Sequence, residues 1–146
     1  NNDSYYEEDV VPKIQKANLD EQFKVLRAKS ISTTEIIQKH FLLMSVFREI
    51  SNLNKRSLAS KYLHFHFPRL FFIYDSRARK ALRDLMKKSG LRAEKSVVTL
   101  PVDGEYASFY TECKYLQDII KQNYKLNLDC REIDNILLAW ASCNGY

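Results

Sequence analysis

The side chains best suited to chemistry in this sequence lie between Ser57 and Arg79. His64 and His66 are two positions apart in a stretch that we expect to be helical. Side chains at that spacing on a helix point about 200° away from each other, so they cannot hold one metal ion together. We therefore predict no metal site and no cofactor, and we regard both histidines as candidate binding residues.

Lys61 and Asp75 are the two candidates for catalysis in the same stretch. Structural roles explain both, and for Asp75 a helix cap is the favoured interpretation. A carboxylate at the start of a helix accepts backbone N–H groups and stabilises the helix by about 1 kcal/mol, while a lysine stem can lie on apolar surface with its amine in water. Glycine-rich phosphate loops and the H-E-x-x-H and G-x-S-x-G motifs are absent from the sequence. We therefore favour a binding module over an enzyme.

A resemblance keeps the enzymatic alternative open. The segment 59–68, A-S-K-Y-L-H-F-H-F-P, and the segment 72–78, F-I-Y-D-S-R-A, resemble a signature of small uncharacterised prokaryotic proteins. Those proteins look distantly similar to the helix-hairpin-helix DNA glycosylase superfamily. The resemblance implies that Asp75 would assist base excision and that Lys61 would attack the sugar, as in bifunctional members. A divergent or degenerate glycosylase-like enzyme is thus the alternative function.

The charge of the chain is unevenly distributed. The formal net charge is +5, yet the block from Lys55 to Lys95 holds twelve Lys or Arg and three acids, a local +9. Such a block concentrates positive potential and attracts nucleic acid or an acidic protein, although a merely solvated helix face has the same pattern. We expect a basic binding surface with these residues: Lys61, His64, His66, Tyr74, Arg77, Lys80 and Arg83.

The positioning elements are predicted to be helices. Only three glycines and three prolines occur, with 45% hydrophobic and 28% charged residues, which favours an all-α fold. We predict a compact single domain of five or six helices over 18–146, with one long loop at 91–105 that includes a short extended stretch at 97–100. The segment 1–17 is expected to be a poorly ordered arm or a short helix. The expected helices cover 19–29, 32–51, 57–65, 76–88, 106–123 and 130–144.

Caps and apolar periodicity support these boundaries. Capping-box pairs occur at Asn18 and Glu21, Ser32 and Glu35, and Asp129 and Glu132, while Ser57 and Asp75 or Ser76 are single caps. Helix 76–88 is expected to turn its apolar residues inward and these cations outward: Arg77, Arg79, Lys80, Arg83, Lys87 and Lys88. The aromatic residues around Pro68 are expected to fill the core: Tyr62, Phe65, Phe67, Phe71, Phe72 and Tyr74. For Tyr62 and Tyr74, together with His64 and His66, the alternative is a pocket beside Asp75 where bases could stack.

The remaining expectations concern surroundings and partners. The three cysteines form no C-x-x-C pair and are expected to be reduced structural thiols. No apolar run approaches the ~20 residues of a membrane span, so we expect a cytoplasmic protein without a membrane partner. A protein-interaction or homo-oligomerisation domain is a further alternative, with the tyrosine-containing arm 1–17 and the loop 91–105 as contact regions.

Overall fold

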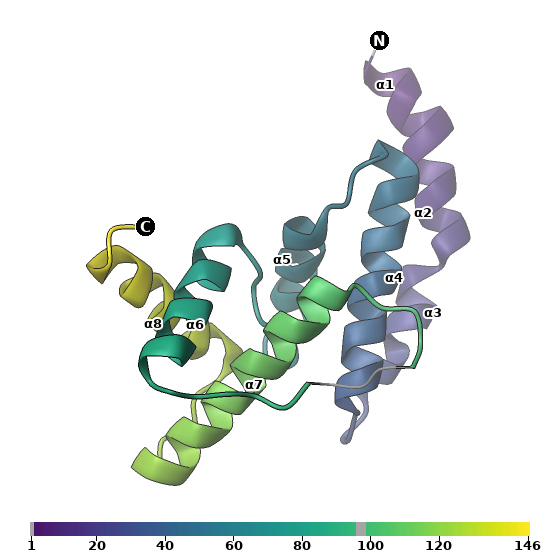
Figure 1. Cartoon of the computed structure of the whole chain (residues 1–146). Coiled ribbons are helices and arrows are strands. Elements are labelled where there is room, and N and C mark those ends of the chain that lie inside the picture. The colour runs from purple at the N-terminus through teal and green to yellow at the C-terminus, as the bar shows by residue number, and fades with distance from the viewer. Residues whose placement is uncertain (1, 96–98) are drawn as a thin grey trace.

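Helices make up the regular structure of the chain. The computed structural model describes residues 2–95 and 99–146, and over these ranges it contains no strand (Figure 1). The all-α prediction is therefore confirmed. The α-helices are α1 (Asn2–Tyr5), α2 (Val11–Ala17), α3 (Leu19–Phe23), α4 (Thr33–Ser51), α5 (Arg56–His66), α6 (Ser76–Lys88), α7 (Gly104–Tyr124) and α8 (Cys130–Cys143). A π-helical turn, Tyr6–Val10, joins α1 to α2, and a 3₁₀ turn, Lys24–Arg27, follows α3.

The N-terminal segment is helical and runs beside α4 (Figure 1). The Tyr5 hydroxyl donates a hydrogen bond to the carbonyl of Ile50, 3.1 Å away, near the end of α4. The predicted cap at Asn18 is wrong, because this residue adopts a left-handed conformation (φ 45°) and its side chain makes no capping bond. Asparagine tolerates that conformation, so Asn18 ends α2, and the predicted helix 19–29 is replaced by α3 and the 3₁₀ turn.

Local capping rules hold for α4 and α8. The Ser32 hydroxyl accepts the Glu35 N–H, and the Glu35 carboxylate accepts the Ser32 N–H at 2.9 Å. Asp129 and Glu132 form the same reciprocal pair at the start of α8. Both predicted capping boxes are confirmed, and each satisfies backbone donors that the first helical turn leaves without partners.

The segment between α5 and α6 crosses the core. Phe71 and Phe72 are almost fully buried. Two tyrosines of α7 hold the backbone of this segment in place. The Tyr106 hydroxyl donates to the Phe72 carbonyl at 3.0 Å, and the Tyr110 hydroxyl donates to the Leu70 carbonyl at 2.9 Å. The predicted core positions of Phe71 and Phe72 are thus confirmed, and the segment leads directly into α6.

Two predictions for α5 are wrong. Ser57 is not its cap, since α5 begins at Arg56 and the residue before it, Lys55, makes no side-chain cap bond. Phe65 is not a core residue, because its side chain is 81% exposed, and Tyr62 is 39% exposed. The physical reason is that α5 turns its small residues and Leu63 toward the core, so its bulky aromatic residues point to solvent.

Helix α6 packs on α8 and is capped as predicted. The Asp75 carboxylate accepts the Ala78 N–H at 2.7 Å. On the α8 side, the Asp84 carboxylate accepts hydrogen bonds from the Trp140 indole and the Tyr146 hydroxyl, both at 2.8 Å. These bonds, the Trp140 bond first, lower the pKa of Asp84 to about 2.

The connection from α6 to α7 begins at Gly90, whose φ of +65° suits glycine. Residues 97 and 98 of the predicted extended stretch 97–100 lie outside the described residues, and Thr99 and Leu100 form no strand. Asp103 caps α7 by accepting the Tyr106 N–H at 3.2 Å. In the described part of the chain, no helix combines the length and apolar character needed to cross a membrane.

His40 is buried between α4 and α7. Its ring stacks on Tyr106 with centroids 3.5 Å apart, and its Nε2 lies 3.2 Å from the Arg56 carbonyl. The Nδ1 atom has no hydrogen-bond partner among the described residues. Burial lowers the pKa of His40 to about 4, against a smaller opposing effect of the bond to Arg56.

We predict that His40 makes the fold sensitive to acid. Because the pKa is about 4 in the folded state against 6.5 for an ordinary histidine, the unfolded chain binds more protons between these values. Stability contributed by neutral His40 is therefore present above pH 6.5, and about 3 kcal/mol of it is lost as the pH falls to 4. Urea unfolding at both pH values should show this loss in the wild type and in His66→Gln, and a smaller loss in His40→Phe. An identical loss in His40→Phe would contradict the assignment.

Candidate functional site

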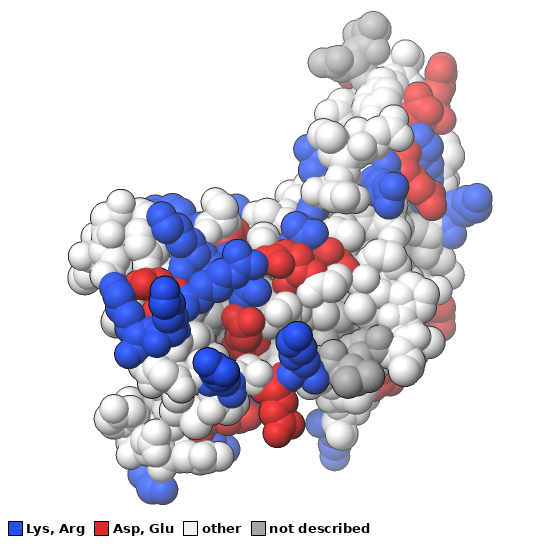
Figure 2. Space-filling model, viewed as in Figure 1, with Lys and Arg blue, Asp and Glu red and all other residues white. Residues whose placement is uncertain are grey.

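Helix α6 positions the cations of the predicted basic surface. Its apolar side faces the core through Ala78, Ala81 and Leu82, all fully buried. Lys and Arg side chains gather over this helix on the face shown in Figure 2, with Asp and Glu side chains beside them. The question is therefore which of these cations have carboxylate partners within the molecule.

Three arginines of the block Lys55–Lys95 are paired with carboxylates at or near the start of α7. The Arg79 guanidinium, 6% exposed, contacts Glu105 at 2.9 Å and also Glu112. Its predicted place on the solvated face is wrong, because these carboxylates draw it toward α7. Arg83 contacts Glu105 at 3.1 Å, and Arg56 forms a short bidentate pair with Asp103. The charge of +9 counted along the sequence thus overstates the charge available at this surface.

Burial and pairing act on the pKa of Arg79 in opposite directions. Burial on its own would lower the pKa of the guanidinium, but hydrogen bonds and the charges of Glu112 and Glu105 raise it above the ordinary value. The Tyr74 hydroxyl also donates to Glu105, at 3.2 Å. Burial, followed by the charge of Glu105, raises the pKa of Tyr74, so this predicted binding residue is a neutral hydroxyl engaged within the protein.

Three further cations of α6 contact other groups of the protein, and in the described part of the chain one of the three forms an ion pair. Lys88 contacts Asp84 at 3.0 Å, and Arg77 donates to the Tyr146 carbonyl at 3.1 Å. Lys80 lies over the Tyr146 ring, 4.2 Å from its centroid, and has no carboxylate partner among the described residues. Of the predicted binding residues on α6, Arg77 and Lys80 therefore have no carboxylate partner in the described chain, but Arg77, unlike Lys80, is already hydrogen-bonded to Tyr146.

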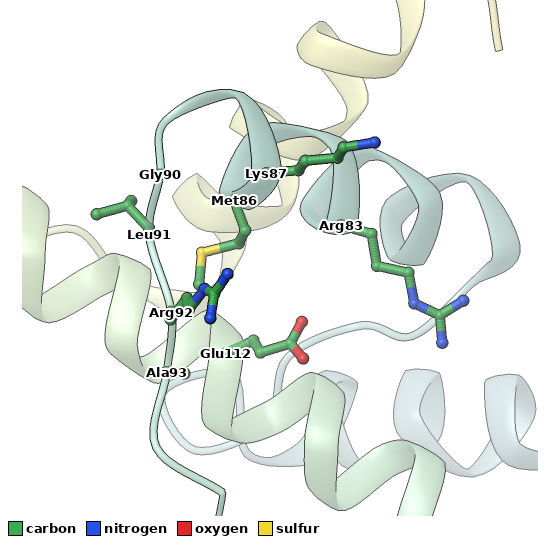
Figure 3. A pocket seen from close by; sticks show the side chains of 8 residues that line it. All are labelled: Arg83, Met86, Lys87, Gly90, Leu91, Arg92, Ala93 and Glu112. Atoms are coloured by element: carbon green, nitrogen blue, oxygen red, sulfur yellow. The ribbon is translucent and has the colours of Figure 1, made fainter.

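A cleft of about 460 Å³ lies where α6 ends and the chain turns at Gly90 (Figure 3). Its cations come from both sides of that turn. In the view of Figure 3, Arg83, Lys87 and Arg92 surround the opening, with Met86 and the Glu112 carboxylate between them. Lys87 and Arg92 make no ion pair in the described part of the chain, whereas Glu112 is already bonded to Arg79. The cleft can therefore accept an anionic group beside an apolar surface.

The cleft was not predicted from the sequence. Lys87 was assigned to the outward face of its helix, but Arg92 lies in an irregular segment and received no role. The sequence feature that could have predicted the cleft is the placement of these two cations on either side of Gly90, where a glycine with positive φ allows the chain to turn.

Lys61, Tyr74 and Asp75 come together elsewhere. They line an open depression of about 540 Å³ between the first turns of α5 and α6, together with Lys55 and Leu58. The structure thus brings the two catalytic candidates, Lys61 and Asp75, to one place. One carboxylate oxygen of Asp75 is occupied by the helix cap described above.

The two histidines of α5 have different surroundings. His64 is half-buried, and its Nδ1 lies 2.7 Å from the Phe71 carbonyl. His66 is exposed and lies against the rings of Tyr62 and Phe65. His66 therefore belongs to the solvent-facing surface of α5, and His64 to the contact with the segment that crosses the core.

Asp134 is a buried carboxylate that the sequence analysis did not single out. It is 4% exposed, and Arg131 donates to one of its oxygens at 2.9 Å. The other oxygen has no partner among the described residues. The pKa of Asp134 is raised, because the effect of burial exceeds the opposing effect of the charges of Arg131, His64 and Lys61. The sequence signal was weak because the adjacent Ile133 and Leu137 dominate the apolar pattern of α8.

No family model, curated protein or solved structure was found to match this chain. The resemblance to DNA glycosylases therefore stays a prediction.

We predict that Arg79 and Arg83 differ in their contribution to stability although both contact Glu105. Replacing Arg79 by Met should cost about 2 kcal/mol of unfolding free energy, because it leaves Glu112 without its cation and Glu105 with only the exposed Arg83. Arg83, 60% exposed at its side chain, should lose less than about 1 kcal/mol in Arg83→Met. Chemical denaturation of the two variants measures this difference. Equal losses would contradict the assignment of Arg79 as the buried partner.

Proposed function

We propose that this protein is a non-enzymatic binding module that contacts the phosphate backbone of nucleic acid through α6 and the adjoining cleft. The observation that carries the proposal is the set of cations there that make neither an ion pair nor a hydrogen bond in the described part of the chain: Lys80, Lys87 and Arg92. Cations that are already paired gain little from a phosphate. Unpaired ones release bound counterions from the nucleic acid when they contact it, which favours binding.

The pairing pattern decides which residues form this surface. Arg79 is excluded because it is buried and bonded twice, and Arg83 shares Glu105 with it. The C-terminal end of α6 carries a partial negative charge, for which Lys87 and Lys88 partly compensate. That is a structural reason for those two lysines, but it does not account for Arg92, which lies beyond the helix on the other side of the cleft.

Catalysis is not part of the proposal. Asp75 caps α6, so its presence is explained without a reaction. Lys61 lies beside it in an open depression, where its amine is exposed to solvent. In the proposed function, Lys61 contributes positive charge at the depression between α5 and the start of α6.

Charge reversal tests the proposal. The triple variant Lys80→Glu, Lys87→Glu, Arg92→Glu should lose most of its affinity for a short nucleic acid at low salt. The slope of the logarithm of affinity against the logarithm of salt concentration should also become shallower by about two to three, since each phosphate contact contributes roughly 0.7 to 0.9. Fluorescence anisotropy at several salt concentrations measures both quantities.

The matched control is the variant Lys16→Glu, Lys29→Glu, Lys121→Glu. It changes the net charge by the same amount at exposed lysines outside the block Lys55–Lys95. We expect this control to keep most of the affinity. Equal losses in the two triple variants would show that only overall charge matters, and no detectable binding by the wild type at low salt would refute the proposal.

A further inference from the structure

A row of exposed apolar and aromatic side chains follows the outward face of α5. Leu58 is 52% exposed, and Tyr62 and Phe65 are exposed as described above. The His66 ring lies 4.5 Å from the Tyr62 ring and 5.4 Å from the Phe65 ring, between centroids. Positions 58, 62, 65 and 66 share one face of a helix. We call these four residues the α5 ridge.

The ridge is not needed for the core of the protein. Helix α5 contacts the interior through its opposite side, where Ala59, Ser60 and Leu63 are fully buried. Tyr62 has a partial contact with Phe47 of α4, with ring centroids 6.4 Å apart, but the Phe65 ring contacts only its neighbour His66 among the described aromatic residues. Single exposed apolar residues are common, whereas a continuous group of them marks a surface that binds something.

The charge around the ridge indicates what it binds. Residues 50–74 contain no Asp or Glu and four Lys or Arg. Arg56 is paired with Asp103, but Lys61 and Arg69 are exposed and make no ion pair in the described part of the chain. Aromatic rings beside unpaired cations suit a ligand that offers flat bases and phosphates together.

We propose that the α5 ridge is a stacking surface for the unpaired bases of a single-stranded nucleic acid. This inference rests on the proposed function, since the phosphates of the same strand would contact the cations of α6. The depression lined by Leu58, Lys61 and Ser76 connects the ridge with the start of α6. Bases in a duplex already stack on each other, so the ridge makes the module prefer single strands.

A second copy of this chain is a poorer occupant of the ridge. In a two-fold symmetric dimer the same surface would face itself. Lys61 would then approach its counterpart, and the one carboxylate that lines the depression beside it is that of Asp75, which already caps α6. An acidic protein would offset the charges, but it does not offer a flat base to stack on each exposed ring as a single strand does.

The variant Phe65→Ala tests the ridge, because a side chain this exposed can be removed without opening the core. Its affinity for a short oligothymidylate should fall on the order of tenfold, the loss typical of one stacked base. Its affinity for a duplex of equal length and for inorganic polyphosphate, which has no bases, should not change. Phe65→Trp should keep or increase the affinity for the single strand, since it retains a ring for stacking.

Tyr124→Ala is the matched control, because Tyr124 is 71% exposed and lies between Lys121 and Lys125 on α7. We expect it to bind all three ligands as the wild type does. The inference is overturned if Phe65→Ala keeps its single-strand affinity or loses affinity for all three ligands equally. It is also overturned if Phe65→Ala only converts a dimer to a monomer on size-exclusion chromatography.

The same measurements separate the inference from the proposed function. If the triple variant of α6 and the cleft loses binding while Phe65→Ala does not, the stacking surface is refuted and the phosphate-binding surface remains. If the wild type binds none of the three ligands at low salt, both proposals fail.

Discussion

Carboxylates at and near the start of α7 hold guanidinium groups from α5 and α6, and the arrangement of the charged surface depends on this pairing. The pairs are Arg56 with Asp103, Arg79 with Glu105 and Glu112, and Arg83 with Glu105. They draw α7 against the other two helices through groups that are partly removed from water, where an ion pair is less screened than on the surface. They also decide which cations remain without partners. The unpaired charge therefore lies at the outer side and the end of α6, and beside α5.

The segment that crosses the core joins α5 to α6, the two helices beside which this unpaired charge lies. Phe71 and Phe72 occupy the centre, with the hydroxyls of Tyr106 and Tyr110 bonded to the backbone of the segment. Ser60 of α5 accepts the Tyr74 N–H at 2.9 Å and so ties the end of the segment back to α5. Because its small residues face this segment, α5 lies close to it and turns its aromatic residues outward. The exposed ridge is thus a consequence of close packing on the other side of the same helix.

Sequence rules predicted features that depend on a few neighbouring residues. The capping boxes at Ser32 and Asp129 and the cap at Asp75 are local, and all three were found, whereas the local caps predicted at Asn18 and Ser57 were wrong. Phe65 was misplaced because periodicity shows which residues share a face but not which face of a short helix meets the core. Arg79 was misplaced because its partners lie 26 and 33 positions away, in a different helix. The cleft was missed for a similar reason, since Arg92 is brought beside Lys87 only by the turn at Gly90.

The central claim is that the unpaired cations at α6 and the cleft contact the backbone of a nucleic acid, and backbone amide spectra test it most directly. A ¹⁵N-labelled sample should be titrated with a short oligothymidylate at low salt, and the amide chemical shifts followed by NMR. The largest shifts are expected from Lys80 to Lys88 in α6, at 90–93, and on α5 from Leu58 to His66. Shifts concentrated at the end of α7, around Tyr124, or no shifts at all, would contradict it.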